Sequence, residues 1–327
     1  MKAVICHAFA PLEQLDFGDI DCPVPTPTEV RIRVHAAGVS FADSLKVEGR
    51  YQVKPALPWV PGSEVSGVVI ETGAQVTQLR TGDRVMGIAD ARAGGFAEEM
   101  VLDAARVLKL PAQMPFDQAA AMPAVYGTSF YALRQRGELK PGETLLVLGA
   151  SGGVGLAAVQ LGHAMGARVI AAASTPEKRA LAQAHGAREA VDYTQPDWRE
   201  QVKALTAGRG ADVVFDPVGG DAFDEAVRCV SWLGRYLLIG FTAGRIPILK
   251  MNMPLLKGYD IRGVRYDVWR DGWWADARAN LEAMLAMYAQ GRIKPLISAA
   301  YPLAEAKQAI RSLTMRGHIG KVVLVND

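Results

Sequence analysis

The chain has 327 residues, 50% of them hydrophobic, and its 36 Lys and Arg residues against 34 Asp and Glu residues leave a net charge of +2. Because a single hydrophobic core rarely grows beyond about 250–300 residues, this length predicts two domains. Charges of both signs are interspersed, and no apolar run approaches the roughly 20 residues of a membrane helix. Neither nucleic acid nor a membrane is therefore an expected partner.

The cysteines and the N-terminus predict a cytoplasmic protein. Cys6, Cys22 and Cys229 are scattered and odd in number, so they indicate neither a disulfide framework nor a metal cluster. Such cysteine usage is typical of a reducing compartment. The N-terminus lacks the apolar region of a secretory signal and is predicted to form a first β-strand.

Residues 1–110 are rich in Val, Pro and Gly and contain short runs in which apolar and polar side chains alternate. A period of two is typical of half-buried strands, and Pro and Gly between the runs indicate turns. This part is therefore predicted to form a compact β-barrel-like domain. The clearest strand candidates are residues 30–35, 67–71, 83–87 and 100–102.

Residues 144–174 have the pattern of a βαβ unit. An apolar run at 145–148 precedes a glycine cluster, an Ala-rich helical stretch and a second apolar run at 168–173. Glycines permit a tight turn close to a pyrophosphate, and the free N–H groups at the helix start then bind the anion. The pattern predicts a dinucleotide site, although Ala150 occupies the first glycine position of the usual spacing. The candidate pyrophosphate-binding residues are Ala150, Ser151, Gly152, Gly153, Val154 and Gly155.

The end of the second apolar run favours NADPH over NADH. Proteins that bind NAD usually carry an acid there, which hydrogen-bonds the ribose 2′-hydroxyl and would repel a 2′-phosphate. Here Ser174 occupies the position, and Lys178 and Arg179 follow as two cations for the same phosphate. The alternative is an ordinary solvated helix N-terminus, with which Pro176 and Glu177 are also compatible.

Residues 125–265 alternate between strand and helix patterns, which predicts an α/β domain with one doubly wound parallel sheet. A helix with an apolar core face is predicted at 273–288, and a last strand at 321–325 is expected to return to the first domain. The expected division is therefore a discontinuous domain, 1–124 with 266–327, and a nucleotide-binding domain, 125–265. The central strand candidates are residues 145–148, 168–173, 190–192, 213–216, 236–239 and 260–263.

Several motifs together resemble those of the medium-chain dehydrogenase/reductase superfamily. They are Gly62-x-Glu64-x-x-Gly67, Gly82-Asp83 and the glycine turn after residue 148. Within that superfamily, the segment 38–43 and the stretch 142–160 are similar to the NADPH:quinone oxidoreductase (zeta-crystallin-like) branch. The resemblance implies a GroES-like β-barrel-type catalytic domain, a Rossmann domain, a cleft between them and a homodimer through the Rossmann sheet edge.

The same resemblance indicates an enzyme that does not use zinc. Zinc alcohol dehydrogenases of the superfamily carry Cys and His at the positions of Ser40 and Ser63, and a serine hydroxyl is a poor zinc ligand. The cysteines of the structural zinc lobe are missing from residues 86–99 as well. Without a Lewis acid, we expect an acceptor that is readily reduced, such as a quinone or an α,β-unsaturated carbonyl.

Further cofactor residues are carried over from the family or follow from position. Tyr193 matches a residue near the adenosine 2′-phosphate, and Thr128 matches one near the nicotinamide. Arg316 and Lys321 resemble residues close to the cofactor, with a plain surface role as the alternative. Residues that follow the carboxyl ends of sheet strands, where such folds bind ligands, are Gly219, Phe241 and Thr242.

The candidate catalytic residues are Tyr51, Ser40 and Asp43. Tyr51 is the expected proton donor because related enoyl reductases use a tyrosine near this position, and Asp43 matches an aspartate that lines the family's site. Ser40 departs from the Asn typical of quinone oxidoreductases and has fewer donors. The expected function is NADPH-dependent quinone reduction, and reduction of enoyl or enal substrates is the alternative. A low-turnover NADPH-binding regulatory protein is the third possibility.

Overall fold

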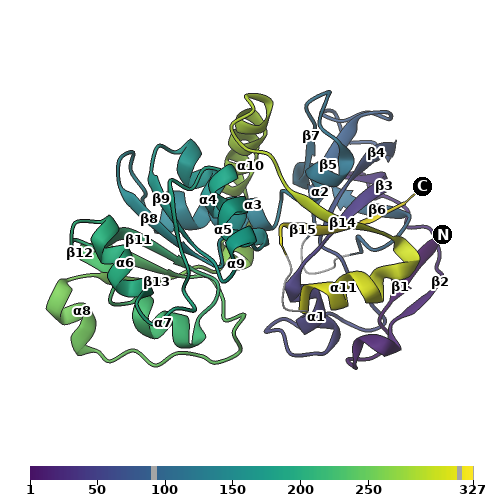
Figure 1. The fold of residues 1–327 in the computed structure, drawn as a ribbon. Helices are drawn as coiled ribbons and strands as arrows, with labels where there is room; N and C mark the ends of the chain where they lie inside the picture. The colour runs from purple at the N-terminus through teal and green to yellow at the C-terminus, as the bar shows by residue number, and fades with distance from the viewer. Residues whose placement is uncertain (90–93, 315–318, 327) are drawn as a thin grey trace. The chain divides into compact units, whose positions relative to one another are not determined.

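The computed structural model of the protein describes residues 1–89, 94–314 and 319–326. The chain divides into two compact units, one formed by residues 1–124 with 295–327 and the other by residues 125–294 (Figure 1). No helix in the described part of the chain combines the length and apolar character that crossing a membrane requires.

The first unit is mainly β-structure. Its elements, in chain order, are β1 (Lys2–Ile5), η1 (Leu12–Gln14), β2 (Asp16–Asp19), β3 (Glu29–Val39), α1 (Phe41–Val47), β4 (Glu64–Thr72), β5 (Arg84–Ile88), β6 (Glu99–Asp103), η2 (Ala104–Arg106), β7 (Val107–Lys109), α2 (Phe116–Ala120), β14 (Ile297–Pro302), η4 (Leu303–Glu305), α11 (Ala306–Thr314) and β15 (Lys321–Val325).

Strand β3 organises this unit. Val30, Ile32 and Val34 are buried, whereas Arg33 between them is exposed, as the predicted alternation requires. Among the described residues the sheet order is β14-β15-β3-β4-β5-β7, with β6 also paired to β3. Register shifts along the β3–β4 ladder accompany this double pairing, and such irregularities bend a strand.

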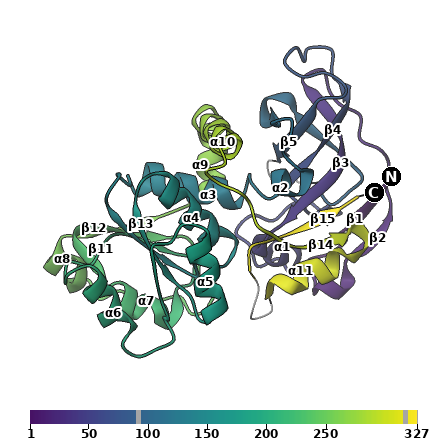
Figure 2. The ribbon, with the colours of Figure 1, turned by 45° about the horizontal axis from the view of Figure 1, so that its top comes forward.

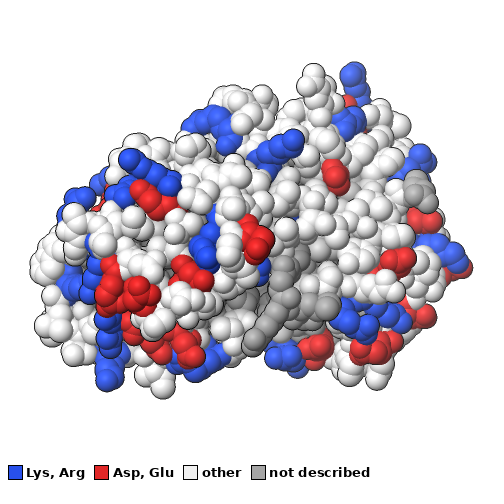
Figure 3. Space-filling model, in the orientation of Figure 1, with Lys and Arg blue, Asp and Glu red and all other residues white. Residues whose placement is uncertain are grey.

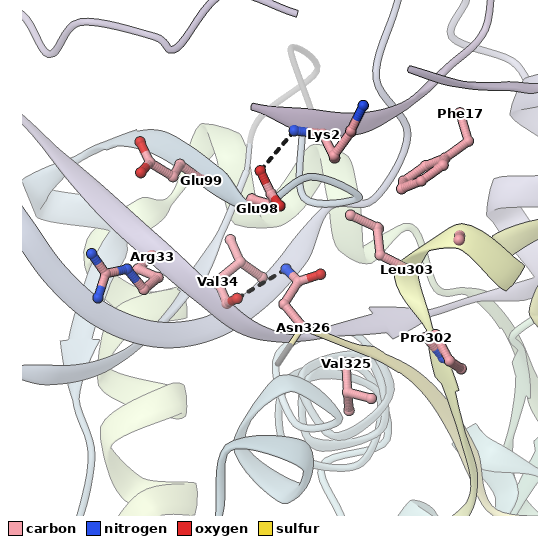
Figure 4. Close-up of a pocket in the computed structure, with 11 residues that line it drawn as sticks. Lys2, Phe17, Arg33, Val34, Glu98, Glu99, Pro302, Leu303, Val325 and Asn326 are labelled. Atoms are coloured by element: carbon pink, nitrogen blue, oxygen red, sulfur yellow. Dashed lines mark hydrogen bonds between the residues drawn. The ribbon is translucent and has the colours of Figure 1, made fainter. Parts of the chain in front are cut away.

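The C-terminal strand returns to the first unit, as predicted. Strand β15 pairs antiparallel with β3 and parallel with β14, so yellow and purple strands lie side by side in both ribbon views (Figure 2). The side chain of Asn326 then donates to the carbonyl oxygens of Val34 and Ala97, at 2.9 and 3.0 Å. A cavity of about 470 Å³ lies beside this end of the chain, where the backbone N–H of Lys2 donates to Glu98 (Figure 4).

The second unit alternates helices and strands. Its elements are α3 (Val125–Tyr131), η3 (Ala132–Arg136), β8 (Thr144–Leu148), α4 (Gly153–Ala164), β9 (Arg168–Ala172), α5 (Pro176–Ala184), β10 (Glu189–Val191), α6 (Trp198–Leu205), β11 (Ala211–Asp216), α7 (Gly220–Ala226), β12 (Val230–Leu238), α8 (Asn252–Lys257), β13 (Asp260–Gly263), α9 (Tyr266–Gly272) and α10 (Trp274–Ala289).

The strands of the second unit form the predicted parallel sheet. In the described part of the chain the order is β10-β9-β8-β11-β12-β13, and each neighbouring pair is parallel. Strand β8 is buried along its whole length, which explains its unbroken apolar run. Helices α4 and α5 pack on β9. From β8 the strands run through β9 to β10 on one side and through β11 to β13 on the other, and sheets of this kind bind nucleotides where the strand order reverses in this way.

The second unit extends further than the sequence analysis assigned. Residues 266–294, expected in the first domain, belong to the second unit because α9 and α10 pack on α3. The rings of Tyr131 and Trp269 stack with centroids 4.3 Å apart, and Arg134 donates to Asn280 at 3.1 Å. The apolar face of α10 was predicted as core, and Ala277, Leu281, Met284 and Leu285 are buried there, with Trp274 and Tyr288 half-buried.

Candidate functional site

The turn between β8 and α4 has the geometry of an anion-binding loop. Gly149 has a φ of +57°, a conformation that favours glycine. A Cβ on Gly155 would collide with the carbonyl oxygen of Gly149, so the loop closes only with glycine at both positions. Gly152 caps α4, whose first turn carries no acidic side chain. The six residues 150–155 thus lie together at a helix N-terminus, whose backbone N–H groups and dipole favour an anion.

Helix α3 is fastened to this loop. The hydroxyl of Ser129 donates to the carbonyl oxygen of Val154 at 2.8 Å, which joins the middle of α3 to the first turn of α4. Thr128, the candidate nicotinamide contact, is the preceding residue and is half-buried. The structure therefore places Thr128 close to the glycine loop within the same unit.

The carboxyl ends of β11 and β12 form one connected edge. Asp216, wholly buried at the end of β11, accepts the backbone N–H groups of Val218 and Gly219 at 2.7 and 2.9 Å. Its other oxygen accepts the hydroxyl of Tyr236 at 2.7 Å. Burial raises the pKa of Asp216, while these hydrogen bonds oppose the shift. Asp216 thereby fixes the turn that carries Gly219.

The loop after β12 contacts that turn. The backbone N–H and the hydroxyl of Thr242 both donate to the carbonyl oxygen of Pro217, at 3.1 and 3.0 Å. A Cβ on Gly219 would lie 2.8 Å from the ring of Phe241, so the two turns approach each other closely. The three candidates at these strand ends are brought together, and the Thr242 hydroxyl is engaged by Pro217.

Ser174 and Tyr193 meet at the end of the sheet formed by β9 and β10. They follow the paired strand ends Ala172 and Val191 by two residues each. Burial raises the pKa of the Tyr193 phenol, and the Ser174 side chain beside it partly opposes the shift. Lys178 lies on the first turn of α5, where its backbone N–H donates to the capping hydroxyl of Thr175 at 3.3 Å. Among the described residues, no carboxylate forms an ion pair with the Lys178 ammonium. A cation and two hydroxyls therefore stand at neighbouring positions of this edge.

Arg179 is engaged differently from the expectation that it points at a phosphate. Its Nη1 atom lies 2.8 Å from Asp192 and donates to the carbonyl oxygen of Ala173 at 3.1 Å. The sequence analysis missed Asp192 as its partner, since no local pattern links the two positions.

The candidate catalytic residues Ser40 and Asp43 form the N-terminal cap of α1. The backbone N–H and the hydroxyl of Ser40 both donate to one oxygen of Asp43, at 2.8 and 2.9 Å, and Asp43 is almost fully buried. This reciprocal cap satisfies helix-terminal groups. Tyr51 follows the same helix, is half-buried, and donates its backbone N–H to Leu45 at 3.1 Å. The contacts assign Ser40 and Asp43 a capping role, and substrate contact by the three residues stays a prediction.

Lys321 lies in a buried ion pair. Its ammonium is 2.6 Å from Glu64, and the two side chains are 5% and 1% exposed. The other oxygen of Glu64 accepts the backbone N–H of Ala124 at 2.7 Å, and a Cβ on Gly38 would collide with this carboxylate. The charge of Lys321 is thus taken up by Glu64, and a role at the cofactor remains a prediction. Arg316 lies outside the described residues.

Comparisons with known proteins cover the whole chain. The family model of the alcohol dehydrogenase GroES-like domain matches residues 26–112, and that of zinc-binding dehydrogenases matches 153–284. A quinone oxidoreductase-like protein 2 homolog from Nematostella vectensis is 40% identical over 91% of this chain and 81% of its own length. The chain belongs to the medium-chain dehydrogenase/reductase superfamily, in its quinone oxidoreductase branch.

Further relatives in the quinone oxidoreductase branch match from end to end. A quinone oxidoreductase from Pseudomonas aeruginosa is 37% identical over 99% of both chains. The crystal structure of Escherichia coli quinone oxidoreductase complexed with NADPH superimposes with a TM-score of 0.89, at 28% identity and 100% coverage of both chains. The protein is accordingly an oxidoreductase of this superfamily, with a GroES-like domain and a Rossmann domain for a nicotinamide cofactor.

The medium-chain dehydrogenase/reductase framework includes two buried carboxylates that the sequence analysis did not assign. Glu64 was quoted only as a motif position, and Asp216 only as the end of a strand. An acid that follows a fully apolar run is the signal for Asp216, since a buried carboxylate needs local donors. No comparable signal identifies the partner of Glu64.

Proposed function

We propose that the protein transfers hydride from NADPH to a quinone without the use of zinc. The observation that carries the cofactor preference is that Ser174, rather than an acid, follows β9, with Lys178 on the next helix and Tyr193 after the neighbouring strand β10. Two hydroxyls and an ammonium donate to a 2′-phosphate, whereas a carboxylate would repel it.

The glycine loop fits the pyrophosphate of this cofactor. The turn closes tightly against α4 because a Cβ on Gly155 would collide with the backbone of Gly149, and the start of that helix offers backbone N–H groups. Thr128, Gly219, Phe241 and Thr242 would hold the nicotinamide half at the carboxyl edge of the sheet. When bound, NADPH supplies the hydride, and Tyr51 is the proposed donor to the oxygen of the acceptor, which gains negative charge.

We expect Lys178→Ala to weaken NADPH binding about ten- to a hundredfold and to leave NADH binding nearly unchanged. A charge-assisted hydrogen bond contributes roughly 1.5–3 kcal/mol, which corresponds to that range of dissociation constants. Fluorescence titration of both cofactors measures the effect, with the exposed Lys250→Ala as the matched control. An equal loss of affinity for NADH would contradict the assignment of Lys178 to the 2′-phosphate.

Activity is expected to persist unchanged after prolonged dialysis against a strong metal chelator. In the ranges 1–89, 94–314 and 319–326, no three His, Cys, Asp or Glu side chains are grouped so that they could hold a metal ion. The Ser40 hydroxyl donates to Asp43, and a hydroxyl is a weak zinc ligand in any case. Steady-state rates of NADPH oxidation before and after dialysis test this expectation, and recovery of a lost rate by added zinc would overturn it.

Reduction of α,β-unsaturated carbonyls is the second candidate, because Tyr51 resembles the tyrosine donor of related enoyl reductases. A donor near the carbonyl oxygen supports hydride addition to an alkene as well as to a quinone. Parallel assays with 1,4-benzoquinone and 2-hexenal at 340 nm separate the two. Faster reduction of the enal would assign the protein to alkene reduction.

The proposed assembly is a homodimer through the edge of the Rossmann sheet. Strand β13 ends the sheet, and exposed apolar side chains on β12 and α8 flank it, among them Trp232, Leu233 and Leu255. Such a patch on a soluble protein indicates an interface. Sedimentation equilibrium measures the oligomeric state.

The surface charges are in keeping with an enzyme that acts on small molecules. Lys and Arg side chains are interspersed with Asp and Glu over the face drawn in Figure 3.

A further inference from the structure

Arg179 joins two strand ends beside the proposed 2′-phosphate pocket. Its guanidinium donates to the carbonyl oxygen of Ala173, just past β9, and pairs with the carboxylate of Asp192, just past β10. The two charged side chains are only 22% and 18% exposed, so the pair is partly shielded from solvent. An ion pair of this kind is worth more than a fully exposed one.

Asp192 is held on both of its oxygens. Arg179 binds one, and the other accepts the backbone N–H and the hydroxyl of Thr194, at 3.0 and 2.6 Å. Partial burial raises the pKa of Asp192, but the Thr194 hydrogen bonds and the Arg179 charge outweigh it and keep the pKa below its usual value. Asp192 is therefore an anion at neutral pH, and Arg179 is its counter-ion.

The residues next to this pair are those proposed to bind the phosphate. Ser174 follows Ala173 and Tyr193 follows Asp192, and Ala172 and Val191 just before them are paired across β9 and β10. Arg179 therefore links Ala173, the residue before Ser174, to Asp192, the residue before Tyr193. Loss of the guanidinium would release both strand ends and leave a carboxylate beside the pocket without its counter-ion.

We propose that Arg179 determines cofactor specificity as a positioning residue: it neutralises Asp192 and holds Ser174 and Tyr193 so that Lys178 binds the 2′-phosphate. The inference rests on the proposed preference for NADPH. An unneutralised Asp192 would repel a 2′-phosphate and accept hydrogen bonds from a free ribose hydroxyl, as the acid of an NAD site does. Arg179 is therefore expected to change the ratio of the NADPH and NADH affinities, and to have little effect on the binding of the parts that the two cofactors have in common.

The test is the binding of 2′,5′-ADP and of 5′-AMP to the full-length protein, measured by isothermal titration calorimetry. Arg179→Met should weaken 2′,5′-ADP roughly tenfold, as expected for an added charge repulsion at close range, and change 5′-AMP much less. The double variant Arg179→Met/Asp192→Asn should recover most of the lost affinity, because the repelling charge is removed as well. Asp192→Asn alone keeps the arginine and should bind 2′,5′-ADP at least as tightly as the wild type.

The outcomes separate this proposal from the one on which it rests. A wild type without preference for 2′,5′-ADP would remove the NADPH assignment itself. A wild type that prefers 2′,5′-ADP, with an Arg179→Met variant that keeps the same ratio, would overturn the role of Arg179 alone. Equal loss of both ligands without recovery in the double variant would likewise overturn it, since that pattern is a general structural defect. If Arg179→Met fails to fold, Arg179→Lys and Asp192→Asn replace it in the test. Both variants are expected to keep the preference for 2′,5′-ADP over 5′-AMP. A tenfold weaker binding of 2′,5′-ADP by Asp192→Asn would overturn the proposal.

Discussion

Replacement of Lys321 by methionine is expected to destabilise the first unit by about 3–5 kcal/mol. The substitution leaves the carboxylate of Glu64 buried without its cation, and removal of one partner of a buried ion pair carries a cost of this size. The backbone N–H of Ala124 still reaches Glu64 but does not neutralise it. Urea unfolding, followed by hydrogen exchange in the peptides that contain β3, β4 and β15, measures the loss within this unit.

Two variants control that experiment. Lys54→Met removes an exposed lysine of the same unit and should change stability by less than about 1 kcal/mol. Glu64→Gln/Lys321→Met removes both charges and should be more stable than the single variant, because a neutral pair has a smaller desolvation cost. A Lys321→Met protein as stable as Lys54→Met would show that the ion pair contributes little.

The local features of the fold were predictable because their causes lie close together in the sequence. The apolar run of β8 needs burial on both faces, and Gly149 and Gly155 are required by a turn that begins one residue after it. Likewise, the alternation around Ile32 identifies a strand with one buried face, as found in β3. Neighbouring residues are sufficient to specify these elements.

Pairings over long sequence distances could not be predicted in the same way. Nothing around Glu64 points to Lys321, and nothing in the segment after β13 shows that α9 and α10 pack on α3 rather than on the first unit. Strand β14 was missed too, because its exposed and half-buried residues alternate without a strong apolar run. In each case the partner is determined by topology rather than by local pattern.

The candidate site was predicted in part for a related reason. Residue types predict Ser174, Lys178 and the glycine loop as cofactor residues because their chemistry suits a phosphate, and the structure places the glycine loop at the start of α4 and Lys178 on the first turn of α5. The same approach did not distinguish a capping serine from one that faces substrate, and the structure engages the Ser40 hydroxyl with Asp43. It also treated Arg179 as a second phosphate ligand because the carboxylate that pairs with it follows a different strand.

Tyr51→Phe is expected to lower the turnover number by about 10²-fold and to leave the affinity for NADPH close to that of the wild type. A positioned acid contributes roughly 10²–10⁴-fold, and the lower end applies because a quinone oxygen accepts charge readily. The backbone of Tyr51 is fixed by Leu45, and the ammonium of Lys46 lies 5.5 Å from the centre of its ring, so loss of the hydroxyl alone should not displace the side chain.

Stopped-flow NADPH oxidation with 1,4-benzoquinone measures the hydride step. The matched control is Tyr301→Phe, at another half-buried tyrosine of the same unit. A turnover number equal in both variants would remove Tyr51 from the mechanism, and the cap formed by Ser40 and Asp43 would then be the next place to search for the donor.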